Sequence, residues 1–120
     1  MKKILLVEDT LHLSEEIADI LGLEGYQVTV ASNGLQALGM LPFAKPQLII
    51  TDYLMPGMNG FEFIEKVKGL SAYKTIPIIV ISARASVEDR ALAMTSGADV
   101  FIAKPCKGEE LIAAVSSLLP

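Results

Sequence analysis

The chain has 120 residues, 52% apolar and 20% charged, which is enough for one domain with a buried core and too few for two. Its 14 acidic and 10 basic residues give a net charge of −4, which argues against a general nucleic-acid-binding protein. One cysteine and one histidine exclude an internal disulfide and a zinc site of the usual kind. No apolar run approaches the ~20 residues that span a bilayer, and no signal-peptide pattern opens the chain, so we expect a cytoplasmic protein.

Five short apolar runs, rich in β-branched residues, recur along the chain. Each has the length and composition of a strand that is buried on both faces. The predicted strands cover residues 4–7, the segment around Val28 and Val30, and residues 48–51, 78–81 and 100–103.

Amphipathic stretches separate these runs and predict five helices. The first has apolar residues at helical spacing from 13 to 21 and stops near Gly25, and the second begins after residues 32–34. We expect Pro42 to end the second helix early, because proline lacks the amide and clashes with the preceding turn. A short third helix covers 61–67, a capping-box-like Ser86 and Asp89 open the fourth, Gly97 closes it, and the fifth covers 109–119.

Buried strands that alternate with helices predict an α/β fold, a parallel sheet with helices on both faces. In such sheets the functional site lies beyond the carboxyl ends of the strands. The residues that follow the strands are therefore the first candidates for function.

Acidic, hydroxyl and basic side chains follow four of the predicted strands: Glu8, Asp9, Asp52, Ser82 and Lys104. Three carboxylates in close proximity repel one another unless a proton or a cation lies among them, and hard oxygen ligands suit Mg²⁺. Together with a lysine and a hydroxyl, they form a site that handles phosphoryl groups, in which a carboxylate oxygen attacks in line and becomes an aspartyl phosphate.

Each of these residues also has an ordinary structural interpretation. Asp9 alone suits a helix cap, Ser82 alone a turn, and Lys104 alone a side chain that extends along the edge of the sheet. The functional interpretation rests on the set, because five separate coincidences would otherwise be needed. His12 as a phosphorylated or metal-binding residue, and Cys106 as a redox group, have no supporting ligand or second cysteine in the sequence.

Five sequence blocks, in this order and spacing, resemble the receiver domain of bacterial two-component response regulators. They are LLVED at 5–9, IITDYLMPGMNG at 49–60, ISA at 81–83, GAD at 97–99 and FIAKP at 101–105. The resemblance covers essentially the whole chain. It implies a single receiver domain over residues 1–120 and a (βα)5 doubly wound, flavodoxin-like sheet of strand order 2-1-3-4-5.

The resemblance also implies a role for each residue at the strand ends. Asp52 matches the phosphoacceptor, which takes a phosphoryl group from a histidine kinase or a phosphotransfer protein. Glu8, Asp9, Asp52 and the backbone carbonyl of Leu54 match the Mg²⁺ ligands. Lys104 matches the lysine that pairs with the phosphoryl oxygens, and the peptide bond that follows it is cis in the family.

Ser82 and Phe101 match the family's switch pair, which relays phosphorylation to the face formed by the fourth helix, the fifth strand and the fifth helix. Phe101 stands where a tyrosine is common, and the apolar Leu54 lies near the expected path of water. We expect the domain to catalyse its own phosphoryl transfer and dephosphorylation, without being an enzyme for a separate substrate. We expect it to bind no nucleic acid or membrane directly.

The expected output is a separate effector protein or a fused output domain. The chain is accordingly a standalone receiver or the N-terminal receiver of a longer regulator or hybrid kinase. The predicted last helix has no basic residue, which disfavours a dimer held by ion pairs on that face, so we expect a monomer or a weak phosphorylation-dependent dimer.

Three other functions compete with this interpretation. A Mg²⁺-dependent phosphatase or phosphotransferase for small substrates also uses an aspartyl nucleophile, but its common signature has a second acid where this chain has Leu54. A flavin or dinucleotide binder needs a phosphate-binding loop after the first strand, where Glu8 and Asp9 stand instead. A receiver that has lost phosphorylation is disfavoured because all of the site positions are filled.

Overall fold

The computed structural model describes residues 1–55 and 57–120. These residues form one parallel sheet of order β2-β1-β3-β4-β5, which confirms the expected flavodoxin-like topology. The strands are β1 (Lys3–Val7), β2 (Gln27–Ala31), β3 (Leu48–Asp52), β4 (Ile78–Ser82) and β5 (Val100–Ala103). Asp52 and Ser82 are thus the last residues of β3 and β4, whereas the sequence predicted strands that end one residue earlier.

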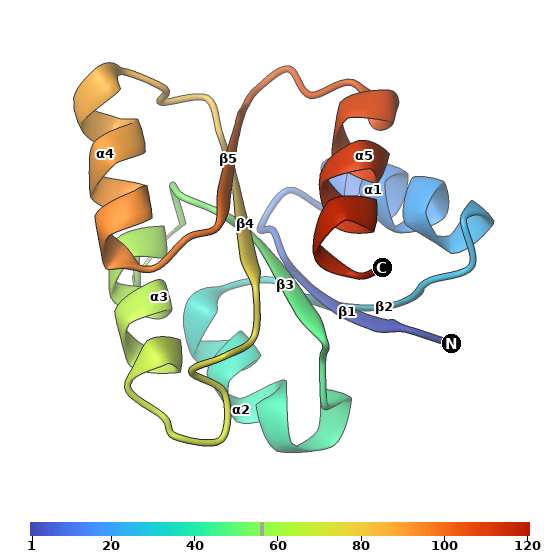
Figure 1. Cartoon of the computed structure of the whole chain (residues 1–120), viewed down its shortest axis with the longest axis horizontal. Helices are drawn as coiled ribbons and strands as arrows, with labels where there is room; N and C mark the ends of the chain where they lie inside the picture. The colour runs from blue at the N-terminus through green and yellow to red at the C-terminus, as the bar shows by residue number, and fades with distance from the viewer. Residues whose placement is uncertain (56) are drawn as a thin grey trace.

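The helices cover the two faces of this sheet, as Figure 1 shows. Helices α1 and α5 pack on one face, and α2, α3 and α4 pack on the other. None of the helices in the described part of the chain is long and apolar enough to cross a membrane. The helices are α1 (Leu11–Leu23), α2 (Gly34–Ala44), α3 (Gly60–Lys68), α4 (Val87–Ser96) and α5 (Gly108–Leu118).

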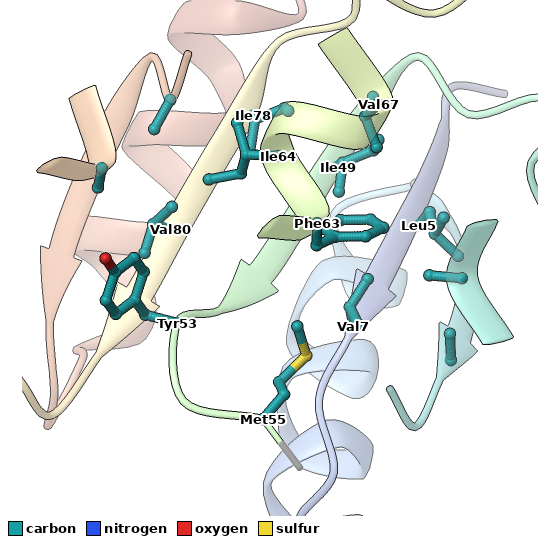
Figure 2. Close-up of a cluster of buried hydrophobic side chains, with 14 of the residues drawn as sticks. Leu5, Val7, Ile49, Tyr53, Met55, Phe63, Ile64, Val67, Ile78 and Val80 are labelled. Carbon is teal, nitrogen blue, oxygen red and sulfur yellow. The ribbon is translucent and has the colours of Figure 1, made fainter. Parts of the chain in front are cut away.

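The sheet separates two apolar cores, because successive side chains of a strand point to opposite faces. On β1, Leu5 and Val7 face the core beneath α2, α3 and α4, and Ile4 and Leu6 face the core beneath α1 and α5. Figure 2 shows the first core, in which Phe63 of α3 is completely buried among strand residues. Both faces of the central strands are therefore buried, and only their carboxyl ends remain available for polar side chains.

Side chains cap the helices where the sequence predicted caps. Asn33 accepts a hydrogen bond from the Gln36 amide at the start of α2. At α4, Ser86 accepts from the Asp89 amide, and the Asp89 carboxylate accepts from the Ser86 amide, which confirms the predicted capping box. Gly97 ends α4 with φ +126°, a conformation that other residues rarely adopt.

The prediction that Pro42 ends the second helix was wrong. Helix α2 continues through Pro42 to Ala44. Because Pro42 lies in the last turn, its missing amide removes only one hydrogen bond from the helix. The Lys45 amide then donates to the Leu41 carbonyl at 3.0 Å, and Lys45 adopts a left-handed conformation with φ 45° that ends the helix.

A lysine at the end of α3 ties down the segment that leads to β4. The Lys68 ammonium group donates to the carbonyls of Lys74 at 3.2 Å and Ile76 at 2.9 Å. The stem of Lys68 lies against Gly97, where a Cβ atom would come within 3.0 Å of it. This contact lies at the end of the sheet opposite the carboxyl ends of the strands and links α3, β4 and the end of α4.

Candidate functional site

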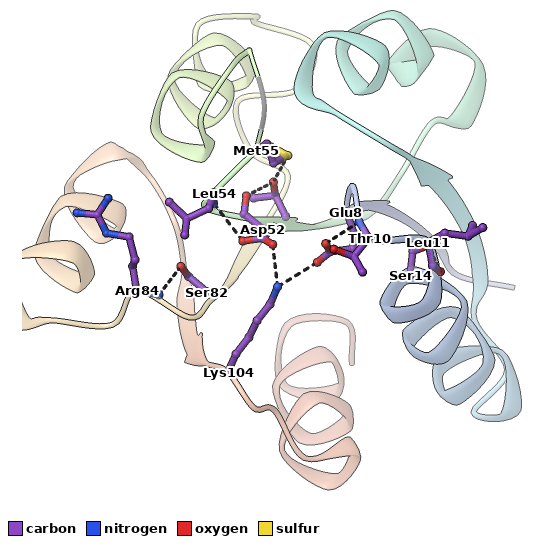
Figure 3. Close-up of polar contacts among 11 residues, drawn as sticks. Glu8, Thr10, Leu11, Ser14, Asp52, Leu54, Met55, Ser82, Arg84 and Lys104 are labelled. Atoms are coloured by element: carbon purple, nitrogen blue, oxygen red, sulfur yellow. Dashed lines mark hydrogen bonds and ion pairs between the residues drawn. The ribbon is translucent and has the colours of Figure 1, made fainter.

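The carboxyl edge of the sheet brings together the acids and the lysine that the sequence singled out, and Figure 3 shows Glu8, Asp52 and Lys104 among them. Glu8 and Asp9 follow β1, Asp52 ends the neighbouring β3, and Lys104 follows β5. Glu8 and Asp52 are buried, whereas Asp9 is exposed. The fold therefore places one exposed and two buried carboxylates around one lysine.

Lys104 bridges the two buried carboxylates. Its ammonium nitrogen lies 2.7 Å from Asp52 Oδ2 and 3.3 Å from Glu8 Oε1. The other oxygen of Asp52 accepts a hydrogen bond from the Leu54 amide at 3.0 Å, and the other oxygen of Glu8 accepts one from the Thr10 amide at 3.1 Å. Each carboxylate is thus held at one oxygen by the backbone and at the other by the lysine.

The three carboxylates form a group with the chemistry of a metal site. One oxygen each from Glu8, Asp9 and Asp52 lies within 4.8 Å of the others. A cluster of hard, anionic oxygens of this kind fits a hard divalent cation. Asp9 does not cap α1, because Thr10 is the N-cap residue and makes no side-chain capping bond. The capping alternative for Asp9 is therefore excluded, and its carboxylate is free to serve this cluster.

Burial and charge shift the pKa values of two groups in this cluster. Burial raises the pKa of Glu8, the charge of Asp52 adds to this effect, and the Thr10 amide and Lys104 oppose it. Burial alone would lower the pKa of Lys104, but the hydrogen bonds and negative charges of Asp52 and Glu8 outweigh it and raise that pKa. Lys104 therefore stays charged at neutral pH and offsets the repulsion between the two acids.

Lys104→Met is expected to destabilise the fold at neutral pH by about 1–2 kcal/mol, because two largely buried carboxylates lose their cation. The raised pKa gives the sign of the pH dependence. The stabilisation is complete below the ordinary lysine pKa of 10.5 and is lost as the pH rises through the higher pKa of the folded state. Urea unfolding across this pH range should show the free energies of unfolding of the wild type and of Lys104→Met converging as the pH rises. Lys107→Met, at an exposed position, is the matched control and should show no such convergence.

Ser82 and Phe101, the predicted switch pair, lie on neighbouring strands. The Ser82 side chain is fully buried, and its hydroxyl accepts a hydrogen bond from the Arg84 amide at 3.0 Å. Val80 pairs with Phe101 in the sheet, so their side chains point to the same face. Ser82 lies two residues further along β4, and its side chain therefore points to the same face of the sheet as Phe101. The Phe101 ring is half-buried and packs against the core beneath α3 and α4.

The segment after Asp52 folds back closely on the start of α3. The Gly60 amide donates to the Tyr53 carbonyl at 2.8 Å, and a Cβ atom at position 60 would lie 2.7 Å from the Tyr53 Cα. Met55 is buried and Met58 packs against the core, whereas Pro56 lies outside the described residues. The close approach at Gly60 fixes the position of Tyr53, directly after the predicted phosphoacceptor.

The chain's only histidine and only cysteine lie away from the centre of this cluster. His12 is exposed on the first turn of α1 and does not belong to the acidic cluster found among the described residues. Cys106 is half-buried, and burial together with the charge of Glu110 raises its pKa. The thiolate form is therefore scarce at neutral pH, which fits the interpretation of Cys106 as a packed thiol.

Two residues make specific contacts near the site that the sequence does not predict. Arg90 of α4 stacks on the Phe101 ring, with its guanidinium carbon 5.0 Å from the ring centre. No local pattern marks this pair, because the two residues belong to different elements. In the sequence, Gly60 is only the last residue of the block at 49–60, and its close approach to Tyr53 depends on the three-dimensional structure.

Comparison with known proteins identifies the family. The response regulator receiver domain model matches residues 4–116. The transcriptional regulatory protein CpxR homolog of Haemophilus influenzae is 37% identical over 119 residues, which are 99% of this chain and 51% of that protein. This chain spans about half the length of the curated relatives it matches.

Solved structures agree with this assignment over nearly the whole chain. The signal receiver domain of a histidine kinase from Syntrophus aciditrophicus has a TM-score of 0.92 and 38% identity, covering 99% of this chain and 90% of that one. The chemotaxis protein CheY4 of Vibrio cholerae has a TM-score of 0.93 and 32% identity, covering 98% of each chain. The chain therefore belongs to the response regulator receiver domain family of two-component signalling systems.

Proposed function

We propose that residues 1–120 act as one phosphorylation-switched signalling domain in which Asp52 accepts a phosphoryl group. The observation that carries this proposal is the 2.7 Å contact between Asp52 Oδ2 and Lys104 within a cluster that also contains Glu8 and Asp9. Membership of the receiver family supports a signalling role over a small-substrate phosphatase or a dinucleotide binder.

Asp52 supplies the nucleophile for this reaction. A carboxylate oxygen forms a bond to phosphorus as the bond from phosphorus to the donor breaks, and the donor leaves with its electron pair. Lys104 neutralises negative charge on the phosphoryl oxygens, and the Leu54 amide holds the other carboxylate oxygen in place. Attack of water on the same phosphorus later breaks its bond to the Asp52 oxygen, which releases inorganic phosphate and the free carboxylate.

The residues that would hold Mg²⁺ are Glu8, Asp9, Asp52 and the backbone carbonyl of Leu54. When bound, the ion supplies positive charge that reduces the repulsion between the carboxylates and the incoming phosphoryl group. The exposed Asp9 leaves the cluster accessible to ions from solvent. The Leu54 amide is bound to Asp52 and the Leu54 side chain is exposed, so we propose that this apolar side chain influences the access of water to the phosphoryl group.

Ser82 and Phe101 are the proposed relay to the face formed by α4, β5 and α5. The Ser82 hydroxyl is bound only to the backbone amide of Arg84 among the hydrogen bonds of the described residues, so it can turn towards a phosphoryl oxygen. Movement of Ser82 would leave space on the face of the sheet that the Phe101 ring shares. The added charge of the phosphoryl group would thus shift Ser82 and Phe101 between two arrangements, and that shift would change the surface of α4, β5 and α5.

A histidine kinase or a phosphotransfer protein is the proposed phosphoryl donor, and the proposed compartment is the cytoplasm, where such donors use ATP. An apolar groove of about 470 Å³ between α1 and the segment before α5 supports a protein donor, because it opens directly beside Lys104. Leu13, Ile17 and Leu111 contribute to its lining. A helix of a donor protein that rests in this groove would bring its phosphoryl group to the site.

The proposed output is an effector protein or an output domain fused to this receiver. Relatives of about twice this length are transcriptional regulators, which supports the second form. The net charge of −4 supports an output through protein contacts, with no direct binding of nucleic acid or membrane by this domain. Helix α5 carries no basic residue, which supports a monomer or a weak phosphorylation-dependent dimer.

Incubation of the purified chain with acetyl phosphate tests the proposed chemistry. Intact-protein mass spectrometry should show one phosphoryl adduct that requires Mg²⁺ and disappears with EDTA. Borohydride reduction followed by peptide mapping should place the adduct at Asp52. Asp9→Asn should raise the Mg²⁺ concentration that is needed, whereas Asp19→Asn, at an exposed position on α1, should not.

Three results would contradict the proposal. An adduct on His12 would assign the phosphoryl group to another residue, and an adduct that is independent of Mg²⁺ would remove the role of the acidic cluster. The third is the absence of any adduct from both acetyl phosphate and a panel of phosphorylated histidine kinase cores, on protein shown to be folded by circular dichroism.

A further inference from the structure

Arg90 connects two parts of the proposed relay that are distant in sequence. Its guanidinium carbon lies 5.0 Å from the centre of the Phe101 ring, and its Nε atom donates to the Ala85 carbonyl at 3.3 Å. Ala85 belongs to the short segment between Ser82, at the end of β4, and Ser86, the cap of α4. One side chain thus contacts both the segment that follows Ser82 and the aromatic ring of β5.

The contact with Phe101 stabilises one orientation of the ring. A guanidinium group within ~6 Å of an aromatic ring centre is attracted by the negative face of the ring. Planar arginine stacks on such a face better than lysine does. The ring packs against the apolar core and is half-buried, and the Arg90 guanidinium lies over its face. A turn of the ring towards the position of Ser82 would break this contact.

Arg90 is committed to these contacts and not to an ion pair. Among the described residues, the nearby acid Asp89 pairs with Arg84 at 3.8 Å, and no carboxylate lies within 4.0 Å of the Arg90 guanidinium. The Asp89 carboxylate is also occupied by the Ser86 amide and hydroxyl. Neutralisation of Arg90 therefore changes its contacts with Phe101 and Ala85 without unpairing a neighbouring acid.

We propose that Arg90 is a positioning residue that holds Phe101 and the segment around Ala85 in their present orientation and so opposes the switch. This inference rests on the proposed function, because the state that it opposes is the phosphorylated one. A ligand that favours the switched state must work against these two contacts. Their removal should therefore make that state easier to reach without any change at Asp52.

Beryllium trifluoride, which takes the place of a phosphoryl group on a carboxylate, is the probe. Its apparent Kd in the presence of Mg²⁺ is measured by ¹⁹F NMR for the wild type and for Arg90→Gln. We expect the variant to bind about two- to five-fold more tightly, which corresponds to about 0.5–1 kcal/mol, the range for an exposed cation–π contact. Arg90→Lys, which keeps the cation but lacks the Nε donor to Ala85, should have an apparent Kd between those of the wild type and Arg90→Gln. Lys66→Gln, on the exposed side of α3, is the charge-matched control and should have no effect.

A double-mutant cycle separates a positioning role from a general effect of charge. In a Phe101→Leu background the ring is absent, so Arg90→Gln should lose most of its effect on the apparent Kd. An effect of the same size in both backgrounds would overturn the proposed contact. An unchanged Kd for Arg90→Gln would overturn the role of Arg90 but leave the proposed function intact. Failure of the wild type itself to bind the probe would overturn both.

Discussion

Asp52→Asn is expected to abolish phosphoryl uptake while leaving the fold intact. The neutral amide is a far weaker nucleophile than the carboxylate, so the yield of adduct from acetyl phosphate should fall by at least about 100-fold. Asparagine keeps an oxygen that can accept from the Leu54 amide, and Lys104 keeps its contact with Glu8 at 3.3 Å. The free energy of unfolding should therefore change by about 1 kcal/mol or less.

Two measurements on the same protein check this expectation. Intact mass after incubation with acetyl phosphate and Mg²⁺ gives the adduct, and urea unfolding gives the stability. Asp19→Asn carries the same substitution on the exposed side of α1 and should keep the wild-type adduct. Full phosphoryl uptake by Asp52→Asn would contradict the assignment of Asp52 and would indicate that Glu8 or Asp9 is the acceptor.

The same variant tests the account of the Glu8 pKa. The charge of Asp52 helps to raise that pKa, so removal of the charge should lower it towards the ordinary value of 4.5. An NMR titration of the Glu8 carboxyl carbon measures this shift. A Glu8 pKa that stays at its wild-type value would show that the charge of Asp52 does not contribute to the raised pKa.

Gly60→Ala is the second substitution expected to have a large effect. The new Cβ atom would lie 2.7 Å from the Tyr53 Cα and 3.0 Å from the Asp52 carbonyl oxygen, so the backbone must shift. Overpacking of this kind costs typically about 1–3 kcal/mol. Displacement of the segment directly after Asp52 should also slow phosphoryl uptake, by about 100-fold for a shift of about 1 Å.

Gly39→Ala is the matched control for this prediction. None of the atoms of the described residues lies within 4 Å of a Cβ atom at position 39, in the middle of α2. Alanine there should stabilise the helix by about 0.5–1 kcal/mol and leave phosphoryl uptake unchanged. Thermal unfolding and the rate of adduct formation distinguish the two glycines. Equal thermal stabilities and equal rates of adduct formation for the two variants would contradict the proposed role of the close contact between Gly60 and Tyr53.

The sheet and the gathering of the polar residues at one of its edges followed from the sequence because each rests on a strong local signal. Of the eight residues in the runs at 48–51 and 78–81, only Thr51 is polar. This pattern is typical of strands that are buried on both faces. Once the strands are parallel, the residues at their carboxyl ends must share one edge. The contacts of Lys104 with Glu8 and Asp52, which are 96 and 52 residues distant, are the result.

What the sequence could not supply depends on tertiary geometry or on small differences in energy. Pro42 carries a strong helix-breaking signal, but the cost falls to one hydrogen bond in a last turn, and the position of that turn is set by packing. The stacking of Arg90 on Phe101 needs the crossing of α4 over β5, and no residue pattern encodes that crossing. The order of strands in the sheet came from the family resemblance rather than from the spacing of the runs.

The hydrogen bonds of Lys68 to the segment between α3 and β4 limit where a reporter domain can be inserted into this chain. The segment between α3 and β4 has the small and polar residues that usually mark a tolerant insertion point. Its carbonyls at Lys74 and Ile76 are nonetheless bound by Lys68, whose stem in turn packs on Gly97. An insertion there would loosen three elements together, so a biosensor based on this fold should carry its graft at another surface loop.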